Sequence, residues 1–315
     1  MRRAQRSTPA GEHRPVLLEE ILTHLRPGLG EVAADCTIGW GGHALELLLR
    51  VGPQGRLIGL DLDADNLPKA RERLQAIGLH FSLHHGNFAG LPAILAAEEL
   101  DAVDLIVADL GMSSMQVDDA GRGFSYVRDG PLDMRMDRSR GRTAAQLLAT
   151  MPQDELRQAL AELGDEPEAE RIAAAIVAAR RQGPLQRTGD LARLILATTR
   201  PAEDPWRLHP APDRWVLHPA ARTFQAMRIL VNRELANLQH LLRLLPTCLK
   251  PGGRAGIISF HSGEDRLVKA AFRSGLQAGV YQQVSPEPVR ASWAERQANP
   301  RARSAKLRWA VRSFL

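Results

Sequence analysis

Three aspartates stand where an acidic side chain can bind a ligand. Asp35 precedes a glycine-rich turn at 39–42, Asp61 ends the next apolar run, and Asp109 ends a later one. Glycine lets the backbone bend sharply and lets a ligand approach N–H groups that a side chain would screen. An acid about 20 residues after such a turn can accept a hydrogen bond from a ribose hydroxyl. We therefore predict a nucleotide-type ligand site.

The stretch 32–44, VAADCTIGWGGHA, is typical of a strand, a glycine turn and the start of a helix. Its G-x-G-x-x-A spacing, from Gly39 to Ala44, also fits the dinucleotide fingerprint. The acid Asp35 before the turn instead resembles the first motif of class I S-adenosylmethionine-dependent methyltransferases, although Thr37 replaces the usual first glycine. The turn alone favours a methyltransferase and leaves open a dinucleotide enzyme or a strand-turn-helix without a ligand.

The composition is that of an ordinary globular protein. The chain has 315 residues, 44% of them hydrophobic and 24% charged, which is enough for one large domain or two. The basic N-terminus has no apolar segment behind it, and no run approaches the roughly 18 apolar residues that a membrane helix needs. We expect a cytoplasmic protein without membrane contact, in which Cys36 and Cys248 stay reduced.

Short apolar runs alternate with amphipathic segments through the first third of the chain. This rhythm predicts a doubly wound, mostly parallel sheet of the Rossmann-like α/β class. A helix is expected at 13–25, with its apolar face at Ile21 and Leu25, and another at 65–77. The predicted strands are 32–34, 56–60, 81–85, 103–108 and 254–260, followed by an antiparallel last strand at 305–311.

The rhythm stops after Gly111. Residues 113–142 read as a loop, and only helix signals follow as far as 199, which predicts an inserted helical domain. From Arg222 to Leu245, apolar residues recur every three or four positions, so we expect one continuous helix that packs on the sheet.

These signals divide the chain into three parts. Residues 1–12 are predicted to be a disordered arm. Residues 13–138 and 215–315 are assigned to the sheet domain. Residues 139–214 are assigned to the helical insertion, including a proline-rich linker that extends to about 219.

The loop after the fourth strand, Asp109 to Ser114, lies where ligands bind in parallel α/β sheets. An exocyclic amine is a poor nucleophile because its lone pair is delocalised into the ring. A carboxylate that accepts its N–H localises the lone pair and aims it at an electrophile, which is a large part of what positioning contributes to catalysis. Asp109 is thus a candidate catalytic residue; contact with the cofactor and capping of the following turn stay open.

Several longer blocks occur in one order along nearly the whole chain. The most extended is DLGMSSMQVDDAGRGFSYVRDGPLDMRMD, at 109–137. Together the blocks resemble the bacterial small-subunit ribosomal RNA N4-cytosine methyltransferases of the MraW type. The others are HRPVLLEE (13–20), TIGWGGH (37–43), HPAARTFQAMRILVN (218–232), SFHSGEDRLVK (259–269) and NPRARSAKLR (299–308).

The resemblance implies a fold, an activity and a set of contacts. The fold is a class I S-adenosylmethionine-dependent methyltransferase with an inserted helical domain, and the activity is methyl transfer to the N4 of a cytidine in the decoding region of small-subunit ribosomal RNA. It implies S-adenosylmethionine as methyl donor, with Asp61 near the ribose and Phe88 beside the adenine. The remaining implied cofactor contacts are Gly41, Gly42, His43, Asp109 and Gln116.

Other polar residues are candidates for the substrate side. Ser113, Arg135 and His261 could bind the RNA or shape the pocket for the target base, as could Arg122 and Arg128. An internal ion-pair network of Asp133, Arg135 and Asp137 is the structural alternative. No cluster of His, Cys and Asp has the spacing of a metal site, so we expect no metal.

The C-terminal region is strongly basic. Residues 290–312 carry seven arginines and lysines against Glu295, the one acid, which is compatible with phosphate binding or with a solvated surface. Trp293 and Trp309 could offer stacking surfaces or could simply pack. The expected partner is small-subunit ribosomal RNA or the assembling small subunit, and a homodimer stays open. The alternatives are a DNA amino-methyltransferase and a non-catalytic ribosome-assembly factor.

Overall fold

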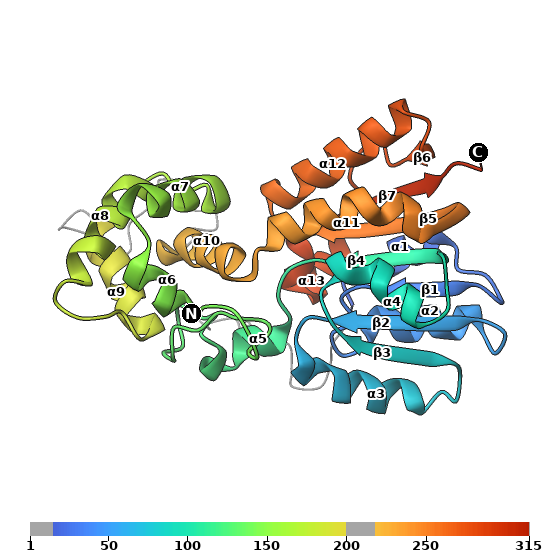
Figure 1. Ribbon diagram of the computed structural model, residues 1–315, viewed down its shortest axis with the longest axis horizontal. Coiled ribbons are helices and arrows are strands. Elements are labelled where there is room, and N and C mark those ends of the chain that lie inside the picture. The colour runs from blue at the N-terminus through green and yellow to red at the C-terminus, as the bar shows by residue number, and fades with distance from the viewer. Residues whose placement is uncertain (1–14, 200–217, 315) are drawn as a thin grey trace. The chain divides into compact units, whose positions relative to one another are not determined.

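The computed structural model describes residues 15–199 and 218–314, which form two compact units (Figure 1). The sheet unit takes the described residues up to Gly111 and from Leu235 onward, and the helical unit runs from Met112 to Glu234. The predicted arm at 1–12 and most of the predicted linker lie outside the described residues.

The sheet unit is built on a seven-stranded sheet in the order β3-β2-β1-β4-β5-β7-β6. The first five strands along the chain pair in parallel, and β7 is antiparallel to both β5 and β6. The predicted α/β class and the antiparallel last strand are confirmed. The strands are β1 Val32–Asp35, β2 Arg56–Asp61, β3 Phe81–His85, β4 Val103–Asp109, β5 Leu249–Ser259, β6 Tyr281–Val284 and β7 Lys306–Arg312.

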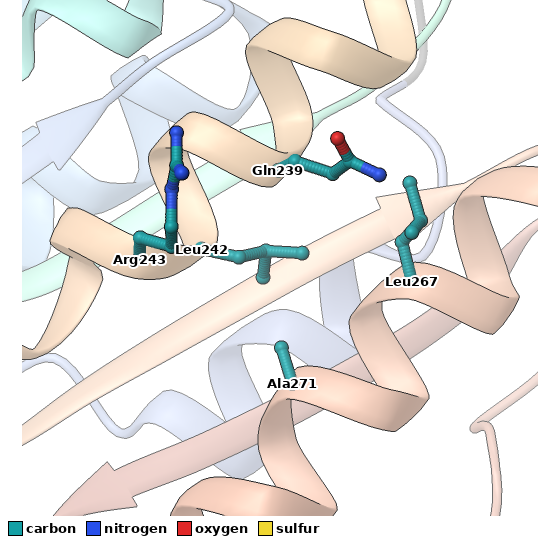
Figure 2. Close-up of a pocket in the computed structure, with 5 residues that line it drawn as sticks. All are labelled: Gln239, Leu242, Arg243, Leu267 and Ala271. Carbon is teal, nitrogen blue, oxygen red and sulfur yellow. The ribbon is translucent and has the colours of Figure 1, made fainter.

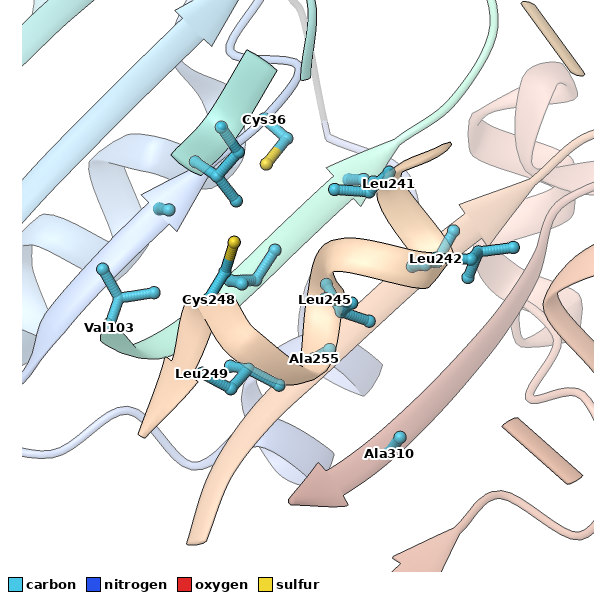
Figure 3. Packing of buried hydrophobic residues seen from close by; sticks show 14 of the residues in the cluster. Cys36, Val103, Leu241, Leu242, Leu245, Cys248, Leu249, Ala255 and Ala310 are labelled. Carbon is cyan, nitrogen blue, oxygen red and sulfur yellow. The ribbon is translucent and has the colours of Figure 1, made fainter. Parts of the chain in front are cut away.

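Two helical layers cover the two faces of this sheet. Alternate strand residues face opposite layers, so Leu105 and Val107 join one apolar cluster while Ile106 and Ala108 join the other. One layer holds α1 (Leu18–Leu25), α2 (Gly42–Val51) and α3 (Leu67–Gln75), and the other holds α4 (Leu91–Ala97), α11 (Glu234–Cys248) and α12 (Ser262–Gln277). Figure 3 shows residues of α11, among them Leu241, Leu245 and Cys248, packed over the central strands.

Helix α1 starts later than predicted. Val16 and Leu17 form a turn, and Leu17 has a left-handed backbone with φ +55° before the helix begins at Leu18. The Leu17 N–H donates to Glu295 Oε1 at 2.8 Å. This contact comes from a residue 278 positions away, so local sequence could not reveal it.

The helical unit packs helices on one another. Gly164, at the end of α7, is required by a close approach to α10, since a Cβ there would lie 2.5 Å from the Arg222 carbonyl oxygen. Thr223 Oγ1 donates to Glu166 Oε2 at 3.1 Å in the same contact. The helices are α5 Ser114–Asp118, α6 Ala144–Thr150, α7 Gln153–Gly164, α8 Ala169–Ala179, α9 Thr188–Thr199 and α10 Ala220–Asn232.

The predicted single helix from Arg222 to Leu245 is wrong. Helix α10 ends at Asn232 and α11 begins at Glu234, because Arg233 between them has φ +52° and donates its N–H back to the α10 carbonyls. The apolar spacing continues across the break, but α10 packs on α7 and only α11 covers the sheet. Glycine is the usual residue for such a stop, so an arginine gave no signal.

The structure also divides the chain at other points than predicted. Residues 112–138 were assigned to the sheet domain, yet several of their long-range hydrogen bonds are to residues between 186 and 232. Leu132 N–H donates to the Gln186 carbonyl at 2.8 Å, and Asn232 on α10 bonds the Met134 carbonyl and the Met136 N–H at 2.8 and 2.7 Å. These long-range bonds draw the loop and α10 into the unit that runs from Met112 to Glu234.

Strand β5 begins at Leu249, ahead of the predicted start at 254. The sequence Lys250-Pro251-Gly252-Gly253 looks like a turn, and Gly252 has φ +75°, but the segment is extended through an irregularity in the pairing with β4. Strand β6 and the short helix α13 (Trp293–Ala298) were not predicted.

Candidate active site

The acids singled out in the sequence lie at one edge of the sheet. Asp35, Asp61 and Asp109 are the last residues of β1, β2 and β4, and all three strands run in the same direction. Ser259, the last residue of β5, follows directly after the partner of Asp109 in the register. Ligands bind at this carboxyl edge in open α/β sheets.

The glycine turn is held by hydrogen bonds from backbone N–H groups to the neighbouring strand. Gly39 and Gly41 have φ +51° and +78°, a conformation that disfavours other residues. The Gly39 N–H donates to Asp61 Oδ2 at 2.8 Å, and Ile38 N–H donates to the Leu60 carbonyl at 2.8 Å. Gly42 begins α2 so close to Pro15 that an added Cβ would lie at 3.2 Å.

Asp61 joins the glycine turn to the loop after β2. Its Oδ1 accepts the Asp63 N–H and its Oδ2 accepts the Gly39 N–H, both at 2.8 Å. Burial raises the pKa of Asp61 to about 6, although these N–H groups oppose the shift. The Asn66 side chain donates a further hydrogen bond to Asp61. Because a carboxylate can accept about four hydrogen bonds, Asp61 can still accept from a ligand hydroxyl.

Asp35 is almost fully buried, with 1% of its surface exposed. Its Oδ1 accepts the Thr37 N–H at 3.1 Å, whereas Oδ2 has no hydrogen-bond partner. Burial raises the pKa of Asp35 to about 7, and the nearby charge of Asp61 adds to the shift. A positively charged ligand beside Asp35 would favour its ionised form.

Asp109 has a similar imbalance. Its N–H donates to Thr37 Oγ1 at 2.6 Å, which ties the end of β4 to the glycine turn, but its buried Oδ1 has no hydrogen-bond partner. Burial raises the pKa of Asp109 well above its usual range, and the charges of Asp35 and Glu264 raise it further, while Arg301 opposes them. A buried acceptor without a donor marks the place where a ligand N–H would fit.

His43 lies between the glycine turn and Asp109. Its Nε2–H donates to the Val16 carbonyl at 2.8 Å, so Nδ1 is the unprotonated nitrogen and faces Asp109 Oδ2 at 3.8 Å. Burial lowers the pKa of His43 to about 4, although the Val16 carbonyl opposes the shift. The ring is therefore neutral near pH 7, and the 3.8 Å approach is not an ion pair.

Two residues near Asp109 were missed in the sequence. Glu264 on α12 is 2% exposed and accepts the Phe260 N–H at 2.8 Å, and its Oε1 lies 3.3 Å from His261 Nε2. Arg301 follows α13 in the short 3-10 helix Pro300–Arg303. The SFHSGED and NPRAR blocks contain both residues, but only the folded chain brings them near Asp109.

Three predicted site residues belong to the helical unit. Ser113 and Gln116 form a capping box on α5, in which Ser113 N–H donates to Gln116 Oε1 at 2.9 Å and Gln116 N–H donates to Ser113 Oγ at 3.4 Å. Arg135 forms a two-pronged ion pair with Asp133, at 2.7 and 3.0 Å. The structural alternative for Arg135 is thus present, while Asp137 binds Arg140. The ligand roles of these residues stay predictions.

Phe88 follows β3 and opens a short 3-10 helix capped by Asn87, whose Oδ1 accepts the Ala89 N–H at 2.8 Å. Its partly buried ring packs against the α4 and α11 side of the core, beside the carboxyl edge. A separate hollow of about 300 Å³ lies between α11 and α12 (Figure 2). No predicted site residue lines this hollow, which is bordered by Gln239, Leu242, Arg243, Leu267 and Ala271.

The described residues also bear on the type of site. They contain no group of three or more His, Cys, Asp or Glu side chains that could hold a metal ion. Within the same residues, no helix is both long and apolar enough to cross a membrane.

Comparison with known proteins places the chain in a family. The model of the MraW methylase family matches residues 10–313. The chain belongs to the MraW methylase family. One relative, ribosomal RNA small subunit methyltransferase H of Citrifermentans bemidjiense, is 43% identical over 311 residues, which cover 94% of this chain and 97% of that one.

A second member with the same description, from Syntrophotalea carbinolica, is 44% identical over 312 residues, or 94% of this chain and 96% of that one. Among solved structures, an S-adenosylmethionine-dependent O-methyltransferase from Thermotoga maritima is similar over 96% of this chain and 68% of that one, with 10% identity and a TM-score of 0.42. Family and topology together make the sheet unit a class I methyltransferase fold.

Proposed function

We propose that the protein transfers a methyl group from S-adenosylmethionine to the N4 of a cytidine in the decoding region of small-subunit ribosomal RNA. The observation that carries this proposal is the pairing of a glycine turn with Asp109 at one edge of the sheet. Thr37 links the two through its hydroxyl, and Asp109 Oδ1 is a buried acceptor without a donor. Membership of the MraW methylase family supports the same activity.

The residues at the glycine turn fit a cationic methyl donor. Asp35 and Asp109 are buried acids whose ionised forms need a nearby positive charge, and S-adenosylmethionine carries a sulfonium and an ammonium group. Gly41, Gly42 and His43 would hold the amino-acid end, Asp61 the ribose hydroxyls, and Phe88 and Gln116 would complete the contacts. The cofactor supplies an activated methyl group whose bond to sulfur breaks as the new bond to nitrogen forms.

The role proposed for Asp109 is to accept an N–H of the cytidine amine. When an ionised Asp109 accepts this N–H from outside the plane of the base, the nitrogen lone pair is less delocalised into the ring. The lone pair can then attack the methyl carbon. The guanidinium of Arg301 favours the ionised form. After transfer the nitrogen carries an extra proton, which is acidic enough to pass to water. Ser113, Arg135 and His261 remain candidates for holding the RNA.

One incubation separates the alternatives. The protein is mixed with methyl-labelled S-adenosylmethionine and, separately, with undermethylated small subunits, naked small-subunit ribosomal RNA or DNA, and the products are digested to nucleosides. Label in N4-methylcytidine from RNA or subunits is the expected result. Label in DNA would indicate a DNA amino-methyltransferase. Cofactor binding without transfer to any substrate would indicate a non-catalytic assembly factor.

The same assay compares naked RNA with the assembling small subunit as partner. A higher rate on subunits would mean that ribosomal proteins or folded RNA help to present the cytidine, which must be flipped or splayed out to be reached. Sedimentation of the protein with and without RNA tests whether it forms a homodimer, which the sequence left open.

A further inference from the structure

The structure separates the seven basic residues of the C-terminal region into two groups. Lys306 and Arg308 bind Asp265 at 3.0 and 2.6 Å, and Arg312 donates to the Leu249 carbonyl. These three side chains bind β7 to α12 and to the start of β5. The other four are exposed, and we call them and the adjacent tryptophan the α13 face: Arg290, Trp293, Arg296, Arg301 and Arg303.

The two tryptophans also separate. Trp309 on β7 stacks on His24 of α1, with ring centroids 5.4 Å apart and planes at 17°, and its burial is intermediate. Trp293, the first residue of α13, is 72% exposed. A large aromatic side chain that is left in solvent among arginines is unusual for a packing residue and is typical of a stacking surface.

The one acid in this segment is turned toward the fold. Glu295 accepts the Leu17 N–H at 2.8 Å and is only partly exposed. Backbone contacts hold two of the arginines along α13, because Arg296 Nε donates to the Ser292 carbonyl at 3.4 Å and Arg303 Nε donates to the Arg296 carbonyl at 3.3 Å. The α13 face therefore presents four exposed arginines and one exposed ring, while Glu295 is bonded to the backbone of Leu17.

We propose that the α13 face binds a single-stranded segment of the RNA substrate, with a base stacked on Trp293 and the flanking phosphates on Arg296 and Arg303. This inference rests on the proposed function and assigns it a second RNA contact besides the target cytidine. Single strands expose base faces that can stack on a ring, whereas duplexes do not. Arg301 lies close to both proposed RNA contacts, since it belongs to the α13 face and its charge lowers the pKa of Asp109 at the candidate active site.

The first test removes the stacking ring. Trp293→Leu keeps an apolar side chain without an aromatic face, so the KM for naked small-subunit ribosomal RNA should rise roughly 5- to 150-fold. The kcat at saturating RNA and the Kd for S-adenosylmethionine should not change. Trp293→Phe should recover most of the affinity. Phe314→Ala, which removes another exposed aromatic residue (71% exposed) from the same unit, is the control and should leave the KM unchanged.

The second test removes charge. Arg296→Ala with Arg303→Ala should lower the slope of log Kd against log salt by about 1.4 for a single-stranded oligoribonucleotide, or about 0.7 for each phosphate that is no longer neutralised. Arg71→Ala with Arg273→Ala removes the same charge from exposed positions on α3 and α12 and should leave the slope near that of the wild type.

For every variant of both tests, the Kd for a single-stranded oligoribonucleotide is also measured by fluorescence anisotropy without cofactor. These Kd values, unlike the KM values of the first test, do not depend on methyl transfer. RNA binding that depends on Trp293 in a protein that transfers no methyl group would refute the proposed function and leave the α13 face intact. Methyl transfer that is equally efficient after Trp293→Leu would refute the α13 face alone. Equal competition by duplex DNA or by an acidic peptide would also overturn the assignment to single-stranded RNA.

Discussion

The aspartates of the two units have opposite electrostatic surroundings. In the sheet unit, burial raises the pKa values of Asp35 and Asp61 to about 7 and about 6, and it raises the pKa of Asp109 well above its usual range. In the helical unit, the Arg187 guanidinium lowers the pKa of Asp129. Arg135 likewise lowers the pKa of Asp133, although partial burial opposes it.

The difference shows where each unit gains or loses stability. The helical unit places an arginine beside Asp129 and beside Asp133, so the charges of these two acids are compensated within the fold. The carboxyl edge of the sheet gathers buried acids and leaves oxygens of Asp35 and Asp109 without donors. Asp265 shows that this is not a property of the whole sheet unit, because Lys306 and Arg308 lower its pKa despite partial burial. Among the described aspartates, those with a buried oxygen that lacks a donor lie at the candidate site, where a cationic ligand would compensate their charge.

The largest expected effect concerns Asp109. Asp109→Ala removes the acceptor for the amine N–H, so kcat should fall by at least roughly 10²- to 10³-fold, to a level near abolition of transfer. Asp109→Asn retains a carbonyl acceptor and should fall between the alanine variant and the wild type. Single-turnover transfer to naked ribosomal RNA measures both.

The matched control is Asp104→Asn, at the other end of the same strand. Asp104 Oδ2 accepts from Lys250 Nζ at 2.7 Å and from the Val32 N–H at 2.8 Å, so this substitution should lower stability and leave kcat unchanged. Near-normal kcat in Asp109→Ala would remove the proposed catalytic role and with it the main contrast between the two units.

The next effect is the pH dependence of stability caused by Asp35. A folded pKa of about 7 against an ordinary value of 3.8 means that the folded state holds the proton more tightly, so stability is present below about pH 4 and is lost as pH rises toward 7. The Asp35→Asn variant has no carboxyl group to ionise at this position, so it does not lose this stability as the pH rises. Between about pH 4 and 8 the free energy of unfolding of the variant, relative to the wild type, should rise by on the order of 2–4 kcal/mol.

Urea unfolding of the cofactor-free protein at several pH values measures this difference. Saturating S-adenosylmethionine should reduce the pH dependence in the wild type, because the cationic ligand stabilises the ionised acid. If the difference in free energy of unfolding between the two proteins does not change across this pH range, the pKa of Asp35 is not raised in the folded state.

The sheet was predictable because buried parallel strands are short apolar runs, and such runs can be recognised from a few neighbouring residues of the sequence. The break at Arg233 and the sharing of residues 112–138 with the helical unit were not, since both depend on bonds to distant residues such as Asn232. Strand β6 was missed because YQQV is short, and only its Tyr281 is buried. Local pattern determined the elements, and long-range hydrogen bonds determined the boundaries.

The candidate site shows the same division. Asp35, Asp61 and Asp109 could be placed at one edge because each follows or ends a strand that was predicted to be parallel, and the structure brings them there. The approach of Glu264 and Arg301 to Asp109 could not be predicted, since both residues lie far along the chain from it. The two tryptophans, Trp293 and Trp309, could likewise be told apart only by their exposure in the structure, because both lie in a basic stretch of the sequence.

The helical unit should respond to pH in the opposite sense. Asp133 has a folded pKa below its usual value, so it contributes stability above that usual value, and the contribution is lost as pH falls through the folded pKa. Asp133→Asn should cost about 1 kcal/mol at neutral pH and progressively less in acid. Urea unfolding over the same pH series measures it, and a cost that grows in acid would contradict the pairing with Arg135.

The smallest expected effect lies at the junction of the two units. Arg233 is exposed, and its left-handed backbone costs roughly 1–2 kcal/mol for a residue with a Cβ. Glycine would remove this strain, but its greater freedom in the unfolded state would offset part of the gain. Arg233→Gly should therefore raise the free energy of unfolding by up to about 1 kcal/mol. Arg243→Gly, at an exposed position inside α11, should lower it by about 1 kcal/mol. If both substitutions destabilise equally, the chain is helical through Arg233, and α10 and α11 would be one helix rather than elements of separate units.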